Sequence, residues 1–167
     1  RRVTAWLKAK YKLTDTTAAP VASLSLAEAT AAGNTEPGKH ILAVSYLTNT
    51  GYVTAPGGHA VITAGATRKT INVSNIPLGP SHIIGRWLWM SKVLRNWDGN
   101  LLNPELFFVK ELKDNTTTSL TEAGGINVYD GQLVASADPY LAALPRIPAG
   151  VALCDYDGSL VSVGEES

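Results

Sequence analysis

The chain has 167 residues, of which 45% are hydrophobic and 17% are charged. This apolar content suffices for a packed core and excludes a fully disordered chain. Lys plus Arg and Asp plus Glu number 14 each, so the formal net charge is zero. A neutral, charge-poor protein is not a general nucleic-acid binder, and little charge repulsion keeps its copies apart. We therefore expect a protein that works in an assembly.

Charge is unevenly distributed along the chain. Residues 1–12 hold five bases and no acid, and residues 127–167 hold six acids against one base, Arg146. These two ends therefore carry net charges of +5 and −5. We predict three parts: a basic N-terminal arm with its linker over residues 1–20, a domain over residues 21–126, and an acidic C-terminal extension over residues 127–167.

Single features exclude several classes of protein. Cys154 is the only cysteine, so an intrachain disulfide and a cysteine-rich zinc site cannot form, and we expect a buried structural thiol. Residues 40–67 contain no Asp, Glu, Lys or Arg, but Pro56 and its neighbouring glycines interrupt them, so we expect no membrane span there. No apolar core of a signal peptide follows Arg1 and Arg2.

The first third of the chain reads as an arm followed by strands. Residues 1–13 have the spacing of a short helix or strand that would need a surface to pack on. Residues 14–20 have the composition of a linker. Residues 21–29 alternate small apolar and polar side chains, which favours a first strand, although the alanines also suit a helix. Residues 39–50 are apolar on both faces, as in a strand buried on two sides.

The middle of the chain continues as short strands. Residues 59–64 are predicted as a strand after the turn at Gly57-Gly58, and residues 69–74 alternate polar and apolar side chains. Residues 83–93 form the strongest predicted strand, and residues 105–112 are its expected partner. A further short strand is predicted over residues 118–121. Because no long helical pattern separates these strands, the sequence predicts an antiparallel β-sandwich.

The C-terminal extension ends in a predicted hairpin. Residues 151–154 and 159–163 are its two strands, and residues 155–158, with the sequence Asp-Tyr-Asp-Gly, form its turn. An isolated two-stranded hairpin is marginally stable in water. We therefore expect it to pack on a neighbour, which is either the domain of the same chain or another chain.

Four sequence blocks occur in order within residues 22–126. They are Gly38-Lys39-His40 with residues 44–51 (VSYLTNTG), residues 71–81 (INVSNIPLGPS), Arg86-Trp87-Leu88-Trp89, and residues 112–122 (LKDNTTTSLTE). They resemble the stretches G-T-H-x-Y-x-V-T-x-V-T-x-x-G, V-x-L-T-N-I-P-x-G-P-S, R-R-I-Y-R and I-x-D-N-T-T-T-x-Y-T-D of a fibronectin-III-like module found in bacteriophage virion proteins. The resemblance implies a β-sandwich in a tail, neck or capsid-associated protein, without an active site.

The chain departs from that family in three places. Trp87 and Trp89 stand where the family has Arg and Tyr, and the normally short hairpin that follows is a long insertion over residues 94–104. The basic arm and the acidic extension lie outside the module. We expect the features particular to this protein to reside in these additions.

Tryptophans give the strongest candidates for a binding site. Trp87 and Trp89 are two residues apart on one strand and share a face. If that face is outward, they form a platform that stacks a sugar or enters a partner; if it is inward, they fill the core. Trp97 lies beside Arg95 in the insertion, and both are residue types enriched at interface hot spots. Alternatively, Trp97 folds back over the end of the sandwich.

The terminal segments give the second set of candidates. The arm mixes aromatic and basic residues, which would suit nucleic acid or an anionic surface, but with zero net charge we favour docking onto a neighbouring subunit. Tyr156 of the hairpin is expected to take part in the same kind of contact. The arm residues assigned to partner binding are Arg1, Arg2, Trp6, Lys8, Lys10, Tyr11 and Lys12.

Neither a metal site nor catalytic chemistry is indicated. His40, His59 and His82 are widely spaced and lack an accompanying carboxylate framework. No phosphate-binding glycine loop and no nucleophile–base motif occurs in the sequence. We therefore predict a protein that is not an enzyme and that has no cofactor.

The sequence hypothesis is a bacteriophage virion structural protein made in the cytoplasm of a bacterial host. Its expected fold is an antiparallel fibronectin-III/Ig-like β-sandwich with an N-terminal arm and a C-terminal β-hairpin. Its expected partners are other capsid, neck or tail subunits and further copies of itself, with no nucleic acid and no membrane. The alternative is a virion-exposed adhesive module that binds host-surface glycans through Trp87, Trp89 and Trp97.

Overall fold

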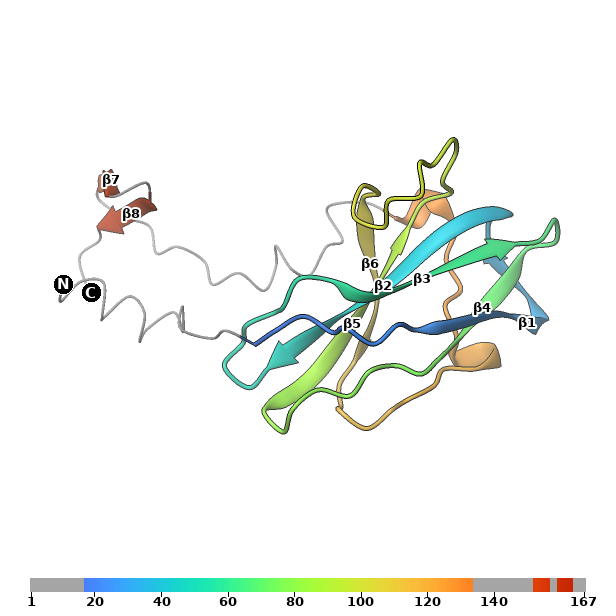
Figure 1. The fold of residues 1–167 in the computed structure, drawn as a ribbon, viewed down its shortest axis with the longest axis horizontal. Helices are drawn as coiled ribbons and strands as arrows, with labels where there is room; N and C mark the ends of the chain where they lie inside the picture. Colours follow the sequence, from blue (N-terminus) through green and yellow to red (C-terminus); the bar gives the residue numbers. More distant parts are fainter. Residues whose placement is uncertain (1–16, 134–151, 157–158, 164–167) are drawn as a thin grey trace.

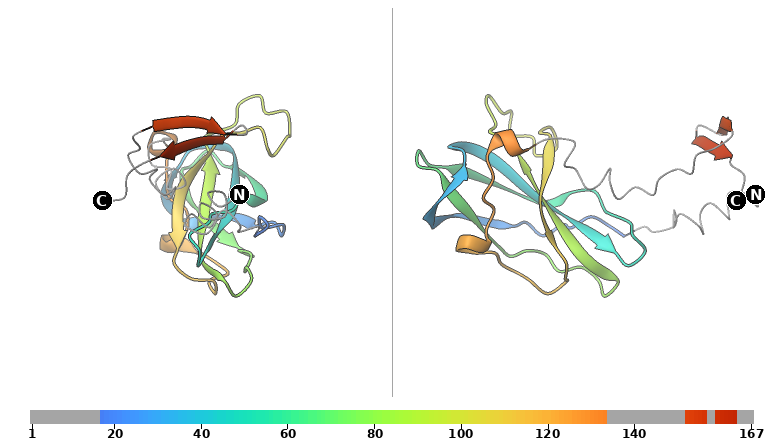
Figure 2. Two further views of the ribbon diagram at one scale, coloured as in Figure 1. Left: turned by 90° about the vertical axis from the view of Figure 1, so that its left-hand side faces the viewer. Right: turned by 180° about the vertical axis from the view of Figure 1, so that it is seen from behind.

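A computed structural model describes residues 17–133, 152–156 and 159–163 of the chain. Over these residues the structure consists of antiparallel strands, and its only helical pieces are two short 3-10 helices, η1 (Glu122–Gly124) and η2 (Asp130–Gln132). Figures 1 and 2 show the two sheets of the main body packed against each other. The prediction of an all-β antiparallel sandwich is therefore confirmed.

The larger sheet has four strands in the order β3-β2-β5-β6. Its strands are β2 (Gly38–Thr48), β3 (Gly57–Ala64), β5 (Ile83–Ser91) and β6 (Leu106–Leu112). The two central strands, β2 and β5, are far apart in the sequence but pair along most of their lengths. The edges of this sheet are therefore β3 and β6.

The smaller sheet pairs β1 (Ser25–Thr35) with β4 (Lys69–Ser74). After β6 the chain crosses back and runs along the outer side of β4, which Figure 2 shows from behind. Two isolated bridges join it to β4, Ile71–Ile126 and Val73–Leu120. The smaller sheet thus gains a partial third strand.

Local patterning located most of the strands correctly. Each strand predicted between residues 39 and 112 is present, with bounds that differ by a few residues. The first strand was predicted over residues 21–29 but begins at Ser25, because the Leu24 amide instead donates to the Gly58 carbonyl oxygen of β3 (3.0 Å). The short strand predicted over residues 118–121 is reduced to the single bridge at Leu120.

The hydrophobic core lies between the two sheets. Side chains at alternate positions of each strand face inward and exclude water, and burying one of them stabilises the fold by roughly 1.5–3 kcal/mol. The buried members come from both sheets and from the connecting segments. They are Leu24, Leu42, Val44, Ile62, Ile71, Val73, Ile76, Leu88, Met90, Leu112 and Ile126.

A second apolar cluster covers the opposite face of the larger sheet. Its buried members are Ala43, Val53, Trp87 and Trp89, and its partly buried members include Phe108. The two clusters explain why residues 39–50 are apolar on both faces: β2 is one of the two central strands of the sheet, and it is buried on both faces.

The packed unit extends beyond the predicted boundary at residue 126. Leu133 is buried, and the Asp130 carboxylate accepts a hydrogen bond from the Val93 amide at the end of β5 (3.0 Å). Residues 127–133, which we had assigned to the acidic extension, therefore pack with the sandwich. The reason is that this segment buries an apolar side chain and caps a strand end, neither of which its charge revealed.

The predicted C-terminal hairpin is present. Strand β7 (Ala152–Tyr156) pairs antiparallel with β8 (Ser159–Val163), and the two form a separate two-stranded sheet. The strand bounds differ slightly from the prediction, because Asp155 and Tyr156 belong to β7 rather than to the turn. The turn residues 157 and 158 lie outside the described residues.

Candidate functional site

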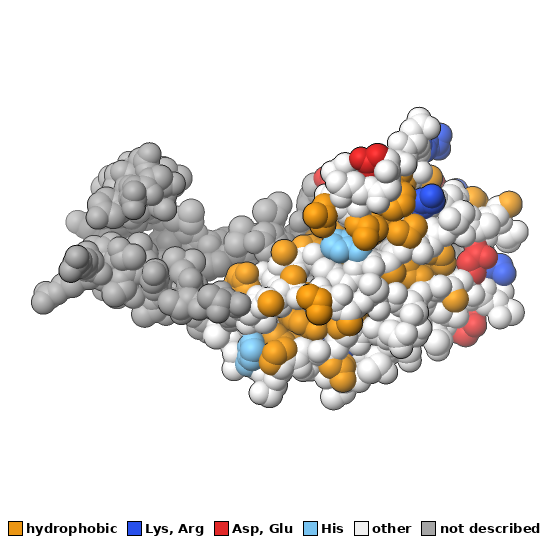
Figure 3. Space-filling view, in the orientation of Figure 1, with side chains coloured by type: hydrophobic (Ala, Val, Ile, Leu, Met, Phe, Trp, Pro, Cys, Tyr) orange, Lys and Arg blue, Asp and Glu red, His pale blue; other side chains and the backbone are white. Residues whose placement is uncertain are grey.

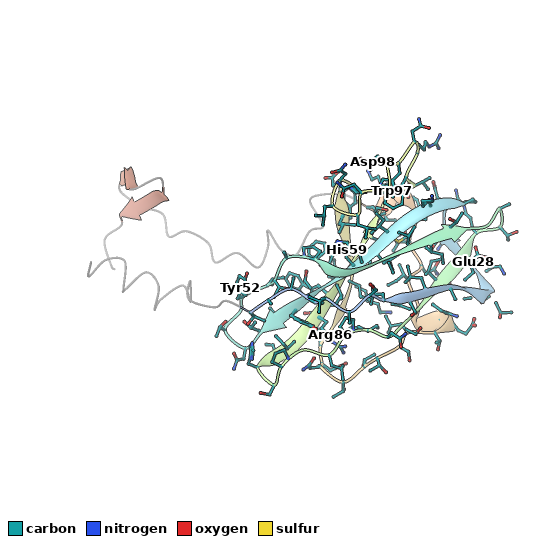
Figure 4. All side chains as sticks on the ribbon, viewed as in Figure 1. Glu28, Tyr52, His59, Arg86, Trp97 and Asp98 are labelled. Carbon is teal, nitrogen blue, oxygen red and sulfur yellow. The ribbon has the colours of Figure 1, made fainter. Side chains whose placement is uncertain are left out.

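Arg86, from the third sequence block, connects strands and loops at one end of the sandwich. Its side chain, labelled in Figure 4, is fully buried, and its Nη2 donates to the Asp114 carboxylate at 2.8 Å. Its Nε and Nη1 donate to the backbone carbonyl oxygens of Asp114 (3.2 Å) and Pro77 (3.3 Å). One side chain of β5 thereby fixes both the loop before it and the loop after β6.

Asp114 and Asn115 hold the same region from the loop after β6. The Asp114 carboxylate accepts hydrogen bonds from the amide of Thr117 (2.7 Å), the amide of Thr116 (2.8 Å) and the Thr117 hydroxyl (2.8 Å). These bonds, with a smaller contribution from the Arg86 charge, hold the pKa of Asp114 well below its ordinary value. The Asn115 side chain pairs with the backbone of Gly79 through two hydrogen bonds of 2.9 and 2.8 Å.

Two residues of the first block have similar roles. The Nδ1 and Nε2 atoms of buried His40 lie 3.0 and 2.9 Å from the carbonyl oxygens of Ser91 and Glu36. The Tyr46 hydroxyl donates to the Leu78 carbonyl oxygen (3.2 Å). Residues from all four blocks therefore contribute to the packing and hydrogen bonding of the sandwich itself.

The depressed pKa of Asp114 predicts a loss of stability in acid. In the unfolded chain this carboxyl takes up a proton near its ordinary pKa of 3.8, whereas in the folded protein it stays ionised to lower pH. The unfolded state thus binds more protons than the folded state as the pH falls. The ionised Asp114 therefore contributes to stability above the ordinary pKa of 3.8, and this contribution is lost as the pH falls below it. Urea unfolding across the acidic range will show a smaller dependence on pH for Asp114→Asn than for the wild type. Equal pH dependence of the two proteins would contradict this assignment, and Glu111→Gln is the control.

Trp87 and Trp89 do not form an exposed platform. They are only 5% and 3% exposed, and with Phe108 they form a triangle of edge-to-face rings whose centroids lie 5.9–6.3 Å apart. The indole Nε1 of Trp89 donates to the Ser45 hydroxyl at 2.9 Å. The expectation that these two tryptophans contact a glycan is therefore corrected. They are buried because the large rings cover one another, and because small residues on the same sheet face leave space for them.

Trp97 lies in the long loop between β5 and β6 (Figure 4), and its ring is half-buried. Its Nε1 donates to the Asn100 carbonyl oxygen (2.9 Å), and the Lys39 ammonium of β2 lies 5.4 Å from the ring centroid. The Asp98 carboxylate accepts hydrogen bonds from the Asn100 amide (2.8 Å) and the Asn103 side chain (2.7 Å). The loop thus has its own internal structure and rests against β2 through Trp97.

This loop surrounds a shallow, open concavity of about 500 Å³. Polar side chains, one aromatic ring and three apolar residues line it, a combination that suits a sugar or a peptide. Arg95 is exposed at its rim. The lining residues are Val93, Leu94, Arg95, Asn96, Trp97, Asp98, Asn103 and Pro104.

The structure brings together only some of the predicted binding residues. Arg95 and Trp97 share the β5–β6 loop, while Trp87 and Trp89 lie apart from it in the buried aromatic cluster. Tyr156 is the last residue of β7. The predicted arm residues, Arg1 to Lys12, lie outside the described residues, so their predicted role stays a prediction.

Sequence reasoning missed one surface. The edge strand β3 and the segment that precedes β1 form a face that carries hydrophobic and uncharged polar side chains, with charged ones only toward its ends (Figures 1 and 3). The available signal was the absence of charged residues from 40 to 67, which we had weighed only against a membrane span. Over the part of the chain that the structure describes, no helix is long or apolar enough to cross a bilayer.

Neither chemistry nor similarity points to a reaction. Among residues 17–133, 152–156 and 159–163, no group of three or more His, Cys, Asp or Glu residues is arranged to hold a metal ion. No protein-family model, no curated protein and no solved structure matches the chain. The described residues therefore offer a loop concavity and a face with few charged side chains, on a sandwich held together by buried polar contacts.

Proposed function

We propose that the chain is a bacteriophage virion structural protein with a fibronectin-III/Ig-like sandwich that assembles through its terminal extensions. The observation that carries the proposal is the contact between residues of separate blocks. Arg86 contacts Asp114, and Asn115 contacts Gly79, although these residues are far apart in the sequence. Such contacts are expected if the blocks belong to one module, and they leave those residues in structural roles.

The strand arrangement supports the fibronectin-III/Ig-like part of the proposal. A four-stranded sheet, β3-β2-β5-β6, packs on a sheet in which β1 pairs with β4. Connections that cross repeatedly between two antiparallel sheets are typical of Greek-key sandwiches of this type. One departure is that the segment after β6 pairs with β4.

The assembly part of the proposal rests on the two ends and on surface charge. The net charges of +5 for residues 1–12 and −5 for residues 127–167 suit a head-to-tail contact between copies. The hairpin β7–β8 is a two-stranded sheet that would gain stability from a further surface. In the virion the partners would be other capsid, neck or tail subunits as well as further copies, after synthesis in the host cytoplasm.

Removal of the extensions tests the proposal. Sedimentation velocity would compare the full chain with chains that lack residues 1–16 or residues 134–167. We expect the full chain to self-associate, each truncation to weaken association, and addition of salt to weaken it further because the ends are oppositely charged. A full chain that stays monomeric at all concentrations, or truncated chains that associate like the full chain, would contradict assembly through the extensions.

The β5–β6 loop favours a second candidate function, the adhesive module that binds a host-surface glycan. A half-exposed tryptophan beside Arg95, Asn96 and Asn103 is a common arrangement for stacking and hydrogen bonding a sugar. A glycan array probed with the wild-type chain and with Trp97→Ala tests this candidate. The adhesive function predicts that the wild-type chain binds a glycan and that Trp97→Ala does not. Absence of binding by the wild-type chain would eliminate this candidate function.

A further inference from the structure

The sandwich has four strand edges, and three of them are protected against pairing with another chain. An unprotected edge presents free amide and carbonyl groups to any passing strand. The outer edge of β4 is covered by four backbone hydrogen bonds between β4 and the segment that follows β6, 2.7–2.9 Å long. The edge of β6 carries Lys110 and Glu111, and its pairing with β5 is interrupted by a bulge.

The edge of β1 is protected in a different way. Two register shifts bend this strand, between Glu28 and Ala32 and between Ala32 and Thr35. Side chains also bond its backbone: the Asn127 side-chain oxygen accepts from the Asn34 amide at 2.6 Å. Bulges and side-chain caps of this kind prevent a flat strand from adding to an edge.

The edge of β3 has no comparable protection over most of its length. The strand contains no charged residue and no proline. Its start is covered, because the Leu24 amide donates to the Gly58 carbonyl oxygen, the one backbone hydrogen bond that β3 makes outside its pairing with β2 among the described residues. Directly after its end, the Gly65 amide donates to the Glu28 carboxylate of β1 at 2.7 Å. Residues 59–64 are therefore left with an open edge, and Val61 on it is 40% exposed.

Charged groups lie near the C-terminal end of this edge, where Lys39 of β2 is opposite Thr63 and the Glu28 carboxylate bonds the Gly65 amide, but none belongs to β3 itself. Burial lowers the pKa of His59, which shares the outer face of β3 with Val61, so its imidazole is neutral at neutral pH. Figure 3 shows hydrophobic and uncharged side chains around it, and Figure 4 places His59 near the middle of this face. Depletion of charge is characteristic of the core of a protein–protein interface.

The chain itself contains a strand that matches this edge. Among the described residues the hairpin β7–β8 forms a sheet of its own, in which each strand pairs on one edge only. Strand β8, with the sequence Ser-Leu-Val-Ser-Val, has no charged residue, whereas β7 contains Asp155. The register places Cys154 and Val161 opposite each other. Among the described residues, β8 and the edge of β3 are thus both uncharged, and each is unpaired along its outer side.

We propose that the β7–β8 hairpin of a second copy adds to the open edge of β3 through β8 and extends the four-stranded sheet. This inference rests on the proposed assembly function and names the surface that receives the C-terminal extension. Backbone hydrogen bonds would supply the affinity, as in other cases of strand addition. Repetition of the contact from copy to copy would give each open β3 edge a partner in a head-to-tail series.

The first test places a charged residue on the edge of β3 in the full chain. Val61→Lys places a charge on an exposed position of β3 and should weaken self-association by about tenfold or more, as edge lysines do in natural sheets. Leu102→Lys is the matched control, because Leu102 is a 79% exposed hydrophobic residue that belongs to the β5–β6 loop and not to β3. Association of Val61→Lys equal to that of the control would overturn the proposal.

Site-directed crosslinking gives the second test and identifies the occupant. In chains carrying Cys154→Ser, one copy would bear Val61→Cys and another Val161→Cys, and a short bismaleimide would join cysteines that lie close together. We expect crosslinked dimers from this mixture, and none when Leu102→Cys replaces Val61→Cys. With both cysteines in one chain, a crosslink confined to that chain would overturn the assignment to a second copy.

The outcomes separate this inference from the proposed function. If the full chain associates through its extensions while Val61→Lys has no effect and no crosslink forms, the β3 site is wrong and the assembly function stands. If the full chain never associates, both are wrong. If the hairpin of the same chain crosslinks to β3, the edge is correct and the second copy is wrong.

Discussion

Replacement of Arg86 with methionine is expected to lower the free energy of unfolding by about 3 kcal/mol. The substitution keeps a long apolar side chain in a fully buried position but removes the donors to three oxygens. Two of these are backbone carbonyl oxygens, of Pro77 and Asp114, which lose their guanidinium donors. Urea denaturation followed by tryptophan fluorescence measures the effect.

The chemistry of the guanidinium decides the choice of controls. Burial lowers the pKa of Arg86 and Asp114 opposes this, but an arginine stays charged at any pH at which the protein folds. Arg86→Lys keeps the charge without the planar fork, so it should recover little of the lost stability. Lys113→Ala removes an exposed ion pair with Glu111, 3.8 Å long, and should cost less than about 1 kcal/mol. A loss for Arg86→Met as small as that of Lys113→Ala would show that the buried contacts contribute little.

Replacement of Trp89 with alanine is expected to cost about 3–5 kcal/mol. The ring is almost fully buried and makes edge-to-face contacts with Trp87 and Phe108, and its Nε1 bonds Ser45. Truncation would remove these contacts and leave a cavity between the remaining rings. Thermal or urea unfolding of the purified variant measures the cost.

Trp97→Ala is the matched control for the same residue type in a different environment. Trp97 is half-buried in the β5–β6 loop and should cost about 1 kcal/mol or less when truncated, as most exposed positions do. If Trp89→Ala and Trp97→Ala lowered the free energy of unfolding by similar amounts, the outer face of the larger sheet would not be a second core. A change in the emission spectrum for Trp89→Ala that Trp97→Ala does not cause would further identify Trp89 as a buried emitter.

The two tryptophan environments have a consequence for function. Because Trp87 and Trp89 are enclosed, a glycan hypothesis now depends on Trp97 and its loop alone. The assembly hypothesis gains a surface, because among the described residues the stretch 59–64 of the β3 edge lacks the backbone bonds, bulges and charged side chains that protect the other three edges. These two surfaces lie on different elements, so substitutions at Trp97 and Val61 separate adhesion from assembly.

Local sequence patterns were sufficient for most of the fold. Alternation of apolar side chains and the turn residues between them located the strands from residue 39 to residue 112, because strand periodicity is a property of adjacent residues. The hairpin was found for the same reason. The first strand was misplaced, because small alanines carry little information on which neighbour the backbone will pair with.

The candidate site was less accessible to sequence reasoning. Spacing shows that Trp87 and Trp89 share a face, but whether that face is covered depends on Phe108, which β6 brings beside them. The absence of charge from residue 40 to residue 67 was visible, but its meaning as an open edge depends on which strands pair.

The sequence by itself therefore determined the fold class, the strands of the middle and the opposite charges of the two ends. Only the tertiary structure decided that the tryptophans are enclosed, that the packed unit continues to Leu133, and that β3 is the unprotected edge. The physical reason is that periodicity and charge are local properties of the chain. Burial and edge protection are set by residues that folding brings together from distant positions.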